Sequence, residues 1–237
     1  QIPVVGGATN RAPGRHLRRD DAGSWELCYR YAAMITVGCA GFAVPATRYF
    51  KEYLFVEVQE THLAVPGPGT VRRWRREAPK GFEFALLGPR EIGQEGFRPG
   101  KVVENALRIL SEVAAELESQ TAVFVAPPDF TAARANKLAL KEFLRLVRRH
   151  FQRVVFDVSA TWDPGEADEL AEESDALAVR DPLATGLSKR NVAYYRLPGP
   201  AGHKSRYEDP AIERLAEVAA GDLEQAATYV FTNVDMF

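Results

Sequence analysis

The 237-residue chain carries 30 basic and 32 acidic side chains, so its net charge is close to zero. This balance excludes a bulk attraction to nucleic acid or to an anionic membrane, and any such binding has to be local. Apolar residues make up 46% of the chain and charged residues 26%, as in an ordinary globular protein. No apolar run reaches the roughly 18 residues of a membrane span. The composition therefore predicts a soluble protein with no membrane partner.

The chain has two cysteines, Cys28 and Cys39, and they form neither a metal-binding pair nor a secreted disulfide framework. This usage excludes a zinc site built from thiolates. It favours a reducing, cytoplasmic location.

The first 33 residues differ from the rest of the sequence. The stretch from Gln1 to Asp21 is rich in Gly, Pro and Arg without an apolar period, and Met34 stands directly before the first strand-like run. We expect residues 1–33 to be an upstream extension outside the fold and residues 34–237 to form a single domain. In the alternative, Ser24–Ala33 form a short helix that docks on that domain, with Trp25 and Tyr29 on one face.

Eight short runs rich in β-branched and aromatic residues, each bounded by turn-forming residues, predict eight strands. They are Ile35–Val37, Leu54–Gln59, Phe82–Leu87, Ala122–Ala126, Val154–Val158, Ala176–Val179, Ala193–Leu197 and Thr228–Thr232. Apolar residues with helical spacing predict helices between the middle strands, from Val102 to Leu117 and from Ala135 to Val147. Thr131, Asp163 and Asp209 are the expected N-caps of three helices.

Eight strands that alternate with helices favour an α/β fold of the TIM-type (β/α)₈ barrel. An open doubly wound sheet is the alternative, but Gly38–Phe42 lacks the glycine-rich phosphate turn of such folds. The connection from Asp181 to Asn191 is too short for a long helix, and only five residues follow the last strand. We therefore expect an incomplete helical ring whose missing eighth helix leaves an apolar strip for the N-terminal segment or a second subunit to cover. Composition leaves the oligomeric state open.

Seven local patterns, in order along residues 34–237, resemble the domain-of-unknown-function family 72, the YecE-like proteins. They are Val37–Phe42, Phe55–Thr61, Thr70–Trp74, Pro79–Ala85, Pro127–Phe130, Tyr195–Gly199 and Thr232–Asp235. The resemblance implies a barrel related in architecture to the apurinic-endonuclease and xylose-isomerase barrels, with no established activity to carry over. As a compact, divergent member, this chain has Leu87 where a lysine is common, Pro198 in place of a histidine, and Phe156–Trp162 in place of an acidic residue and arginine.

In a barrel the functional face is formed by the loops at the carboxyl ends of the strands. This rule selects candidate catalytic residues and candidate ligand-binding residues. The catalytic candidates are Glu57, Asp157 and Asp235, and the ligand-binding candidates are Gln59, His62, Arg180, Arg196, His203, Lys204, Tyr207 and Asn233.

Glu57 is the first candidate because a carboxylate inside an apolar strand is costly to bury unpaired and could have a raised pKa suited to proton transfer. The alternative is a structural ion pair between Glu57 and either Arg180 or Arg196. The two arginines could equally hold a carboxylate or phosphate of a ligand in bidentate geometry.

No cofactor is required by the spacing of the candidates. The one candidate cofactor is a divalent cation such as Mg²⁺, which His62, Glu57, Asp157 and Asp235 could hold together. Because their spacing does not require a metal, these residues are not assigned as metal ligands. Cys39 is more typical of a small buried residue than of a catalytic thiolate.

Two basic runs, Val71–Arg76 and Arg145–Arg153, raise the possibility of a nucleic-acid partner. Their apolar members keep helical spacing, which favours the solvated outer faces of barrel helices. The glycine-containing loop Pro198–Tyr207 is a better candidate for phosphate, because barrels often bind phosphate after strand seven. The alternative is a surface loop without a ligand.

Two functions are therefore open. One is an enzyme that acts on a phosphate-bearing or nucleotide-like small molecule at the barrel mouth. The other is a non-catalytic barrel that binds a small ligand or a partner protein, as the leucine and proline at positions 87 and 198 suggest.

Overall fold

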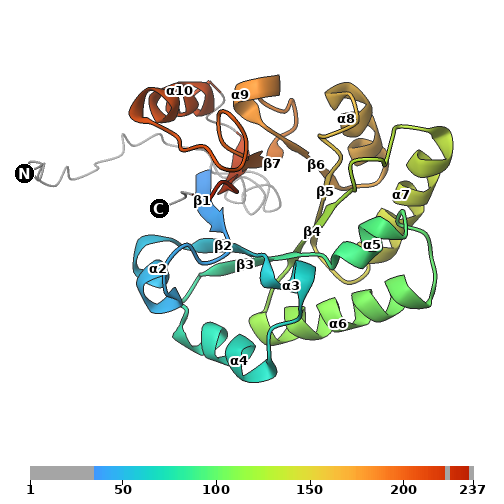
Figure 1. Cartoon of the computed structure of the whole chain (residues 1–237), viewed down its shortest axis with the longest axis horizontal. Coiled ribbons are helices and arrows are strands. Elements are labelled where there is room, and N and C mark those ends of the chain that lie inside the picture. Colours follow the sequence, from blue (N-terminus) through green and yellow to red (C-terminus); the bar gives the residue numbers. More distant parts are fainter. Residues whose placement is uncertain (1–34, 222–224, 235–237) are drawn as a thin grey trace, which may run out of the picture. The chain divides into compact units, whose positions relative to one another are not determined.

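A computed structural model describes residues 35–221 and 225–234, and it shows eight parallel strands that close into a barrel with each strand beside its neighbours in sequence (Figure 1). β8 pairs with β1, with Val230 opposite Gly38. The strands are β1 (Ile35–Ala40), β2 (Phe55–Val58), β3 (Glu83–Leu87), β4 (Thr121–Val125), β5 (Arg153–Asp157), β6 (Leu177–Arg180), β7 (Val192–Leu197) and β8 (Ala226–Phe231). All eight predicted strands and the TIM-type barrel are confirmed.

Helices lie between the strands and surround the barrel (Figure 1). They are α2 (Ala46–Glu52), α3 (Glu60–Leu63), α4 (Pro68–Glu77), α5 (Arg90–Gln94), α6 (Lys101–Leu117), α7 (Arg134–Val147), α8 (Pro164–Glu173), α9 (Pro182–Thr185) and α10 (Asp209–Ala219). The connection before β7, predicted to be too short for a long helix, contains only the four-residue α9. Within the described ranges no helix follows β8, and Ile35 and Val37 on β1 are 46% and 40% exposed.

The predicted helix starts are right in one case and wrong in two. The carboxylate of Asp163 accepts a 2.8 Å hydrogen bond from the backbone N–H of Gly165, as an N-cap does. Thr131 is not a cap, because α7 begins at Arg134 and its N-cap is Ala133. Asp209 lies inside the first turn of α10, one residue after the N-cap.

Alternation along the strands separates two apolar regions. Residues that point into the barrel, such as Phe55, Val123 and Val179, form an interior cluster, while the opposite strand faces pack against the helices. Leu87 belongs to the interior cluster and is 4% exposed, so an apolar side chain fills the space at this level of the barrel.

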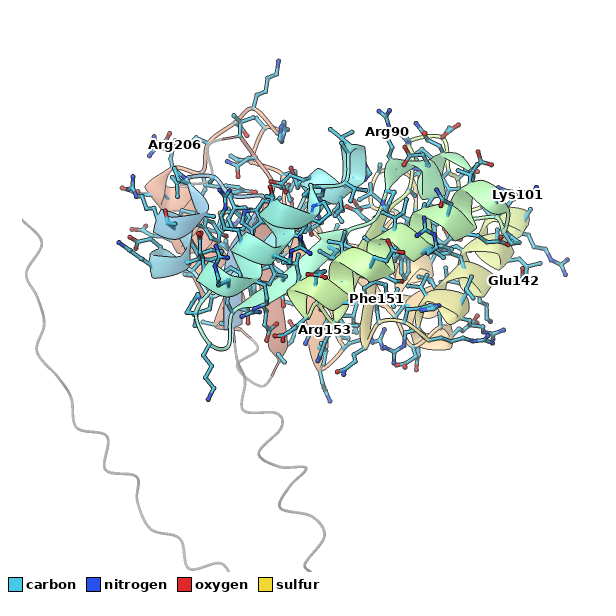
Figure 2. All side chains as sticks on the ribbon, turned by 90° about the horizontal axis from the view of Figure 1, so that it is seen from below. Arg90, Lys101, Glu142, Phe151, Arg153 and Arg206 are labelled. Atoms are coloured by element: carbon cyan, nitrogen blue, oxygen red, sulfur yellow. The ribbon has the colours of Figure 1, made fainter. Side chains whose placement is uncertain are left out.

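The two ends of the barrel can be followed in a side view. Arg90 and Arg206, which come after the carboxyl ends of β3 and β7, lie along one edge (Figure 2). Arg153, the first residue of β5, lies on the opposite, lower side. We call the first edge the mouth. The expected N-terminal extension (residues 1–33) and its alternative helix, Met34 and Asp235 lie outside the described residues.

Candidate functional site at the barrel mouth

Three charged side chains from three separate strands meet inside the mouth. Glu57 lies on β2, Asp157 ends β5 and Arg196 lies on β7, and the strand pleat turns each of them inward with the apolar residues of the interior cluster. We call these three residues the mouth triad.

Arg196 bridges the two carboxylates with the two arms of its guanidinium. One terminal nitrogen is 3.1 Å from Oε1 of Glu57, and the other is 2.9 Å from Oδ2 of Asp157. The side chain of Glu57 is 0% exposed and that of Arg196 is 14% exposed. The pair that the sequence left open between two arginines therefore forms with Arg196, and a planar fork suits it because each arm can serve a different carboxylate.

The second oxygen of Glu57 is bonded to a tyrosine. The hydroxyl of Tyr194 donates a 2.8 Å hydrogen bond to Oε2 of Glu57. Burial, followed by the negative charge of Glu57, raises the pKa of Tyr194 well above its usual value. The phenol is therefore a neutral donor, and both oxygens of Glu57 are occupied within the fold.

The guanidinium of Arg196 stays charged in spite of its burial. Burial acts to lower the pKa of Arg196, but the carboxylates of Glu57 and Asp157 outweigh it, and the net pKa is raised. Its Nε–H has no acceptor within the described ranges. The mouth triad has two negative charges and one positive charge.

Asp157 is the carboxylate of the mouth triad whose side chain has exposed surface, 13% against 0% for Glu57. Its Oδ1 accepts hydrogen bonds from the backbone N–H of Ser159 at 3.1 Å and from the Ser159 hydroxyl at 2.6 Å. Together with Arg196 these are three donors. A carboxylate has about four lone-pair positions, which leaves one for a ligand.

Arg180 lies on the other side of its strand. Val179 points into the barrel, so Arg180 points outward, where its guanidinium pairs with the carboxylate of Asp168 on α8 and lies 3.3 Å from the carbonyl oxygen of Pro164. The structure therefore does not bring Arg180 to the mouth triad, contrary to the expected neighbourhood.

Gln59 and His62 lie beyond the end of β2. The strand ends at Val58, so Gln59 is not its next inward residue but the N-cap of α3. Nδ1 of His62 is 2.7 Å from the carbonyl oxygen of Gly88. A carbonyl only accepts, so this contact requires the proton on Nδ1 and places His62 against the end of β3.

The loop from β7 to α10 is held by its own contacts and by the segment after β8. The hydroxyl of Tyr207 accepts a 3.0 Å hydrogen bond from the backbone N–H of Gly199, so this buried tyrosine anchors the loop. Nδ1 of His203 is 2.7 Å from the carbonyl oxygen of Thr232, and the amide of Asn233 donates to the carbonyl oxygen of Ser205 at 3.0 Å. Lys204 and Arg206, two positions apart in this loop, are both exposed.

The candidate cation ligands do not gather into a metal site in the part of the chain that the structure describes. There, no three side chains from His, Cys, Asp and Glu gather in a metal-binding arrangement. Of the four candidate ligands, Glu57 is occupied by Arg196 and Tyr194, and His62 contacts Gly88. Asp235 lies outside the described residues.

The sequence interpretation missed two members of the site. Tyr194 lies two residues before Arg196, so strand alternation places both on the inner face. Ser159 lies two residues after Asp157, the spacing at which an aspartate commonly binds a following backbone N–H. Both signals were available in the sequence.

Among the helices of the described ranges, none combines the length and the apolar character that a membrane span requires.

Comparison with solved structures supports the barrel. A DUF72 family protein from Enterococcus faecalis V583 superposes with a TM-score of 0.65 at 16% identity, covering 86% of this chain and 91% of that one. One from Thermotoga maritima MSB8 gives 0.63 at 21% identity, covering 86% and 93%. The 3-keto-D-glucoside 4-epimerase YcjR of E. coli gives 0.51 at 12% identity, covering 84% and 92%.

Sequence comparison is decisive for the family. No curated protein matches the sequence at a significant level. The model of one family, "Protein of unknown function DUF72", matches residues 46–236, which is most of the chain. The resemblance seen in the local patterns is therefore confirmed, and the protein belongs to the DUF72 family.

Proposed function

We propose that this barrel is an enzyme that binds a small phosphate-bearing molecule with free hydroxyl groups, such as a sugar phosphate or a nucleotide, at its mouth. The observation that carries the proposal is Arg196, whose fork fixes a partly exposed aspartate, Asp157, at the end of β5. An aspartate held in one orientation with a lone pair to spare can accept a proton from a ligand hydroxyl.

The roles of the mouth residues follow from their surroundings. Glu57 is fully buried, so it serves as a positioning residue that holds Arg196 rather than as the group that exchanges a proton with a ligand. The Nε–H of Arg196 supplies a donor for a ligand oxygen. Asp157 is then the catalytic acid or base.

The charge of the mouth decides where a phosphate would sit. The mouth triad has a net negative charge and would repel it, and Arg180 is engaged by Asp168. The exposed cations of the β7–α10 loop, His203 when protonated, Lys204 and Arg206, are the remaining candidates. This divides the ligand into a hydroxyl-bearing part at Asp157 and an anionic part at the loop.

A non-catalytic ligand-binding barrel is the second candidate function. It is favoured by the internal pairing of the mouth triad, in which Glu57 has no surface and Arg196 little. In that case the ion pair between Arg196 and Asp157 is purely structural, and the ligand would contact only the β7–α10 loop.

The test is a panel of glucose 6-phosphate, AMP, ADP and pyrophosphate, screened by thermal shift and isothermal titration with the full chain. We expect at least one phosphate ester to bind. Lys204→Gln should raise its Kd about tenfold, the loss of one charge-assisted contact. Arg214→Gln, which removes an exposed charge from α10, is the matched control and should bind as wild type does.

Turnover of the bound ester, followed by NMR, separates the two functions. An enzyme of the proposed kind should convert it, and Asp157→Asn should stop the conversion while the Kd stays within about threefold. Binding without conversion, unchanged by Asp157→Asn, would establish the non-catalytic barrel. If no member of the panel binds, the phosphate ligand is wrong.

A further inference from the structure

A polar cavity lies at the opposite end of the barrel from the mouth. It has a volume of about 700 Å³ and lies where β3, β4 and β5 begin. Arg153, on its wall, lies on the lower side of the barrel in Figure 2, away from Arg206 at the mouth. We call it the amino-terminal cleft. Its charged lining residues are Arg75, Lys80, Glu83, Glu118 and Arg153.

Both basic runs of the sequence contribute to this cleft. Arg75 lies in the last turn of α4 and belongs to the first run, with Lys80 three residues after that helix. Arg153 ends the second run and begins β5. The other arginines of the first run, Arg72, Arg73 and Arg76, are exposed, whereas Val71 and Trp74 are buried, as helical spacing predicts. Residues about 75 positions apart in sequence thus place positive charge in one cavity.

The cations of the cleft are only loosely paired. Arg75 is 3.8 Å from Glu118, and Arg153 is 3.9 Å from Glu83, both beyond hydrogen-bond length. No carboxylate in the described ranges pairs with Lys80. The carboxylates themselves are largely exposed, Glu118 at 76% and Glu83 at 50%. An incoming anion can therefore displace both contacts without breaking a buried hydrogen bond.

Arg75 is nevertheless held in place. Its guanidinium lies over the ring of Phe84, 5.4 Å from the centroid, and one nitrogen is 3.4 Å from the carbonyl oxygen of Phe82. Lys80 precedes Gly81, whose φ of +84° sets the turn into β3 and is costly for any other residue. The cleft is thus a fixed arginine beside a long flexible lysine.

Amide side chains complete the lining. Gln120 and Gln152 also line the cleft and are exposed. An amide can donate to a phosphate oxygen or accept from a ligand hydroxyl. Three cations against two carboxylates leave the cleft with one excess positive charge.

We propose that the amino-terminal cleft is a second ligand site, which binds a small phosphate-bearing molecule through Arg75, Lys80 and Arg153. Three convergent cations suit a group with two or more negative charges, and the fork of Arg75 suits two oxygens of one phosphate. The site is independent of the mouth and of the function proposed there. Its position, away from the loops that form the mouth, makes it a binding site rather than a catalytic one.

Pyrophosphate and citrate are the probes, titrated calorimetrically into the full chain at low salt. Wild type should bind pyrophosphate at least tenfold more tightly than citrate, and Lys80→Gln or Arg153→Gln should each raise the Kd about tenfold. Equal affinity for citrate would overturn the preference for phosphate. Binding that is unchanged in both variants would overturn the site.

A gain in affinity gives a test that misfolding cannot imitate. Glu83→Gln removes the carboxylate that faces Arg153, so it should lower the Kd for pyrophosphate about threefold to tenfold. Lys204→Gln, at the mouth, is the control that separates the two sites. If Lys204→Gln abolishes pyrophosphate binding and Glu83→Gln has no effect, the phosphate belongs to the mouth and the cleft proposal is wrong.

Discussion

The two ends of this barrel use charge in opposite ways. At the mouth, the guanidinium of Arg196 lies within 3.1 Å of a carboxylate oxygen of Glu57 and of Asp157, and the three side chains are at most 14% exposed. At the amino-terminal cleft, the arginines and carboxylates are 3.8 and 3.9 Å apart and much more exposed. The difference shows that a buried charge is paired with an opposite charge of the same chain, whereas a loosely paired, exposed charge is available to a ligand.

The contrast also changes how the polar residues of the mouth are interpreted. Two inward carboxylates suggest an acid and base pair, but the bridge of Arg196 divides their roles, since Glu57 holds the arginine and Asp157 reaches the surface. Removing the charge of Arg196 should therefore damage the fold, because it leaves Glu57 buried without a cation, and removing a cleft charge should not. The following predictions test that difference, beginning with the largest expected effect.

Arg196→Met should be the most damaging single change at the mouth. It leaves Glu57 as a buried carboxylate without its cation, and breaking such a pair costs about 3–5 kcal/mol of unfolding free energy. Urea unfolding followed by circular dichroism measures the loss. Arg180→Met, which breaks the outward pair with Asp168, is the matched control and should cost less, because Asp168 is 27% exposed and water can solvate its carboxylate. Equal losses in the two variants would contradict the buried bridge.

Glu57→Gln in the Arg196→Met background should recover part of that loss. The neutral amide keeps the shape of the side chain and can still accept from Tyr194, but it removes the unpaired charge. We expect the double variant to be about 2 kcal/mol more stable than Arg196→Met alone. The measurement is a double-mutant cycle by urea unfolding. Additive losses, with no recovery, would show that the two side chains do not act as a pair.

Tyr194 should make the barrel sensitive to alkali. Its pKa is raised in the folded protein, so above the unfolded value of about 10 the unfolded chain releases a proton that the barrel keeps. The contribution of Tyr194 to the free energy of unfolding is fully present below pH 10 and is lost as the pH rises further. Tyr194→Phe should reduce the fall in unfolding free energy by about 1.4 kcal/mol per pH unit above pH 10. Unfolding curves between pH 8 and 11.5 measure both slopes, and identical slopes would count against the buried phenol.

Strand order and the barrel were predictable because short apolar runs and their spacing carry that information. The direction of each side chain was predictable as well, and neglecting it caused the main error in the site. Val179 and Tyr194 fill the barrel, so alternation sends Arg180 outward and Arg196 inward. Pairing distances were not predictable, because they depend on where β2, β5 and β7 meet across the barrel. The amino-terminal cleft was not predictable either, because the two basic runs that line it come together only when the sheet closes into a barrel.

Charge removal at the amino-terminal cleft should have the smallest effect on stability. Arg153 and Glu83 are 39% and 50% exposed and 3.9 Å apart, and such pairs contribute about 0–1 kcal/mol. We expect Arg153→Gln and Glu83→Gln each to change the unfolding free energy, measured by urea unfolding, by less than about 0.5 kcal/mol. A loss comparable to that of Arg196→Met would mean that the cleft charges hold the fold. A negligible loss, together with a changed affinity for pyrophosphate, is the combination that separates a site for a ligand from a bridge within the barrel.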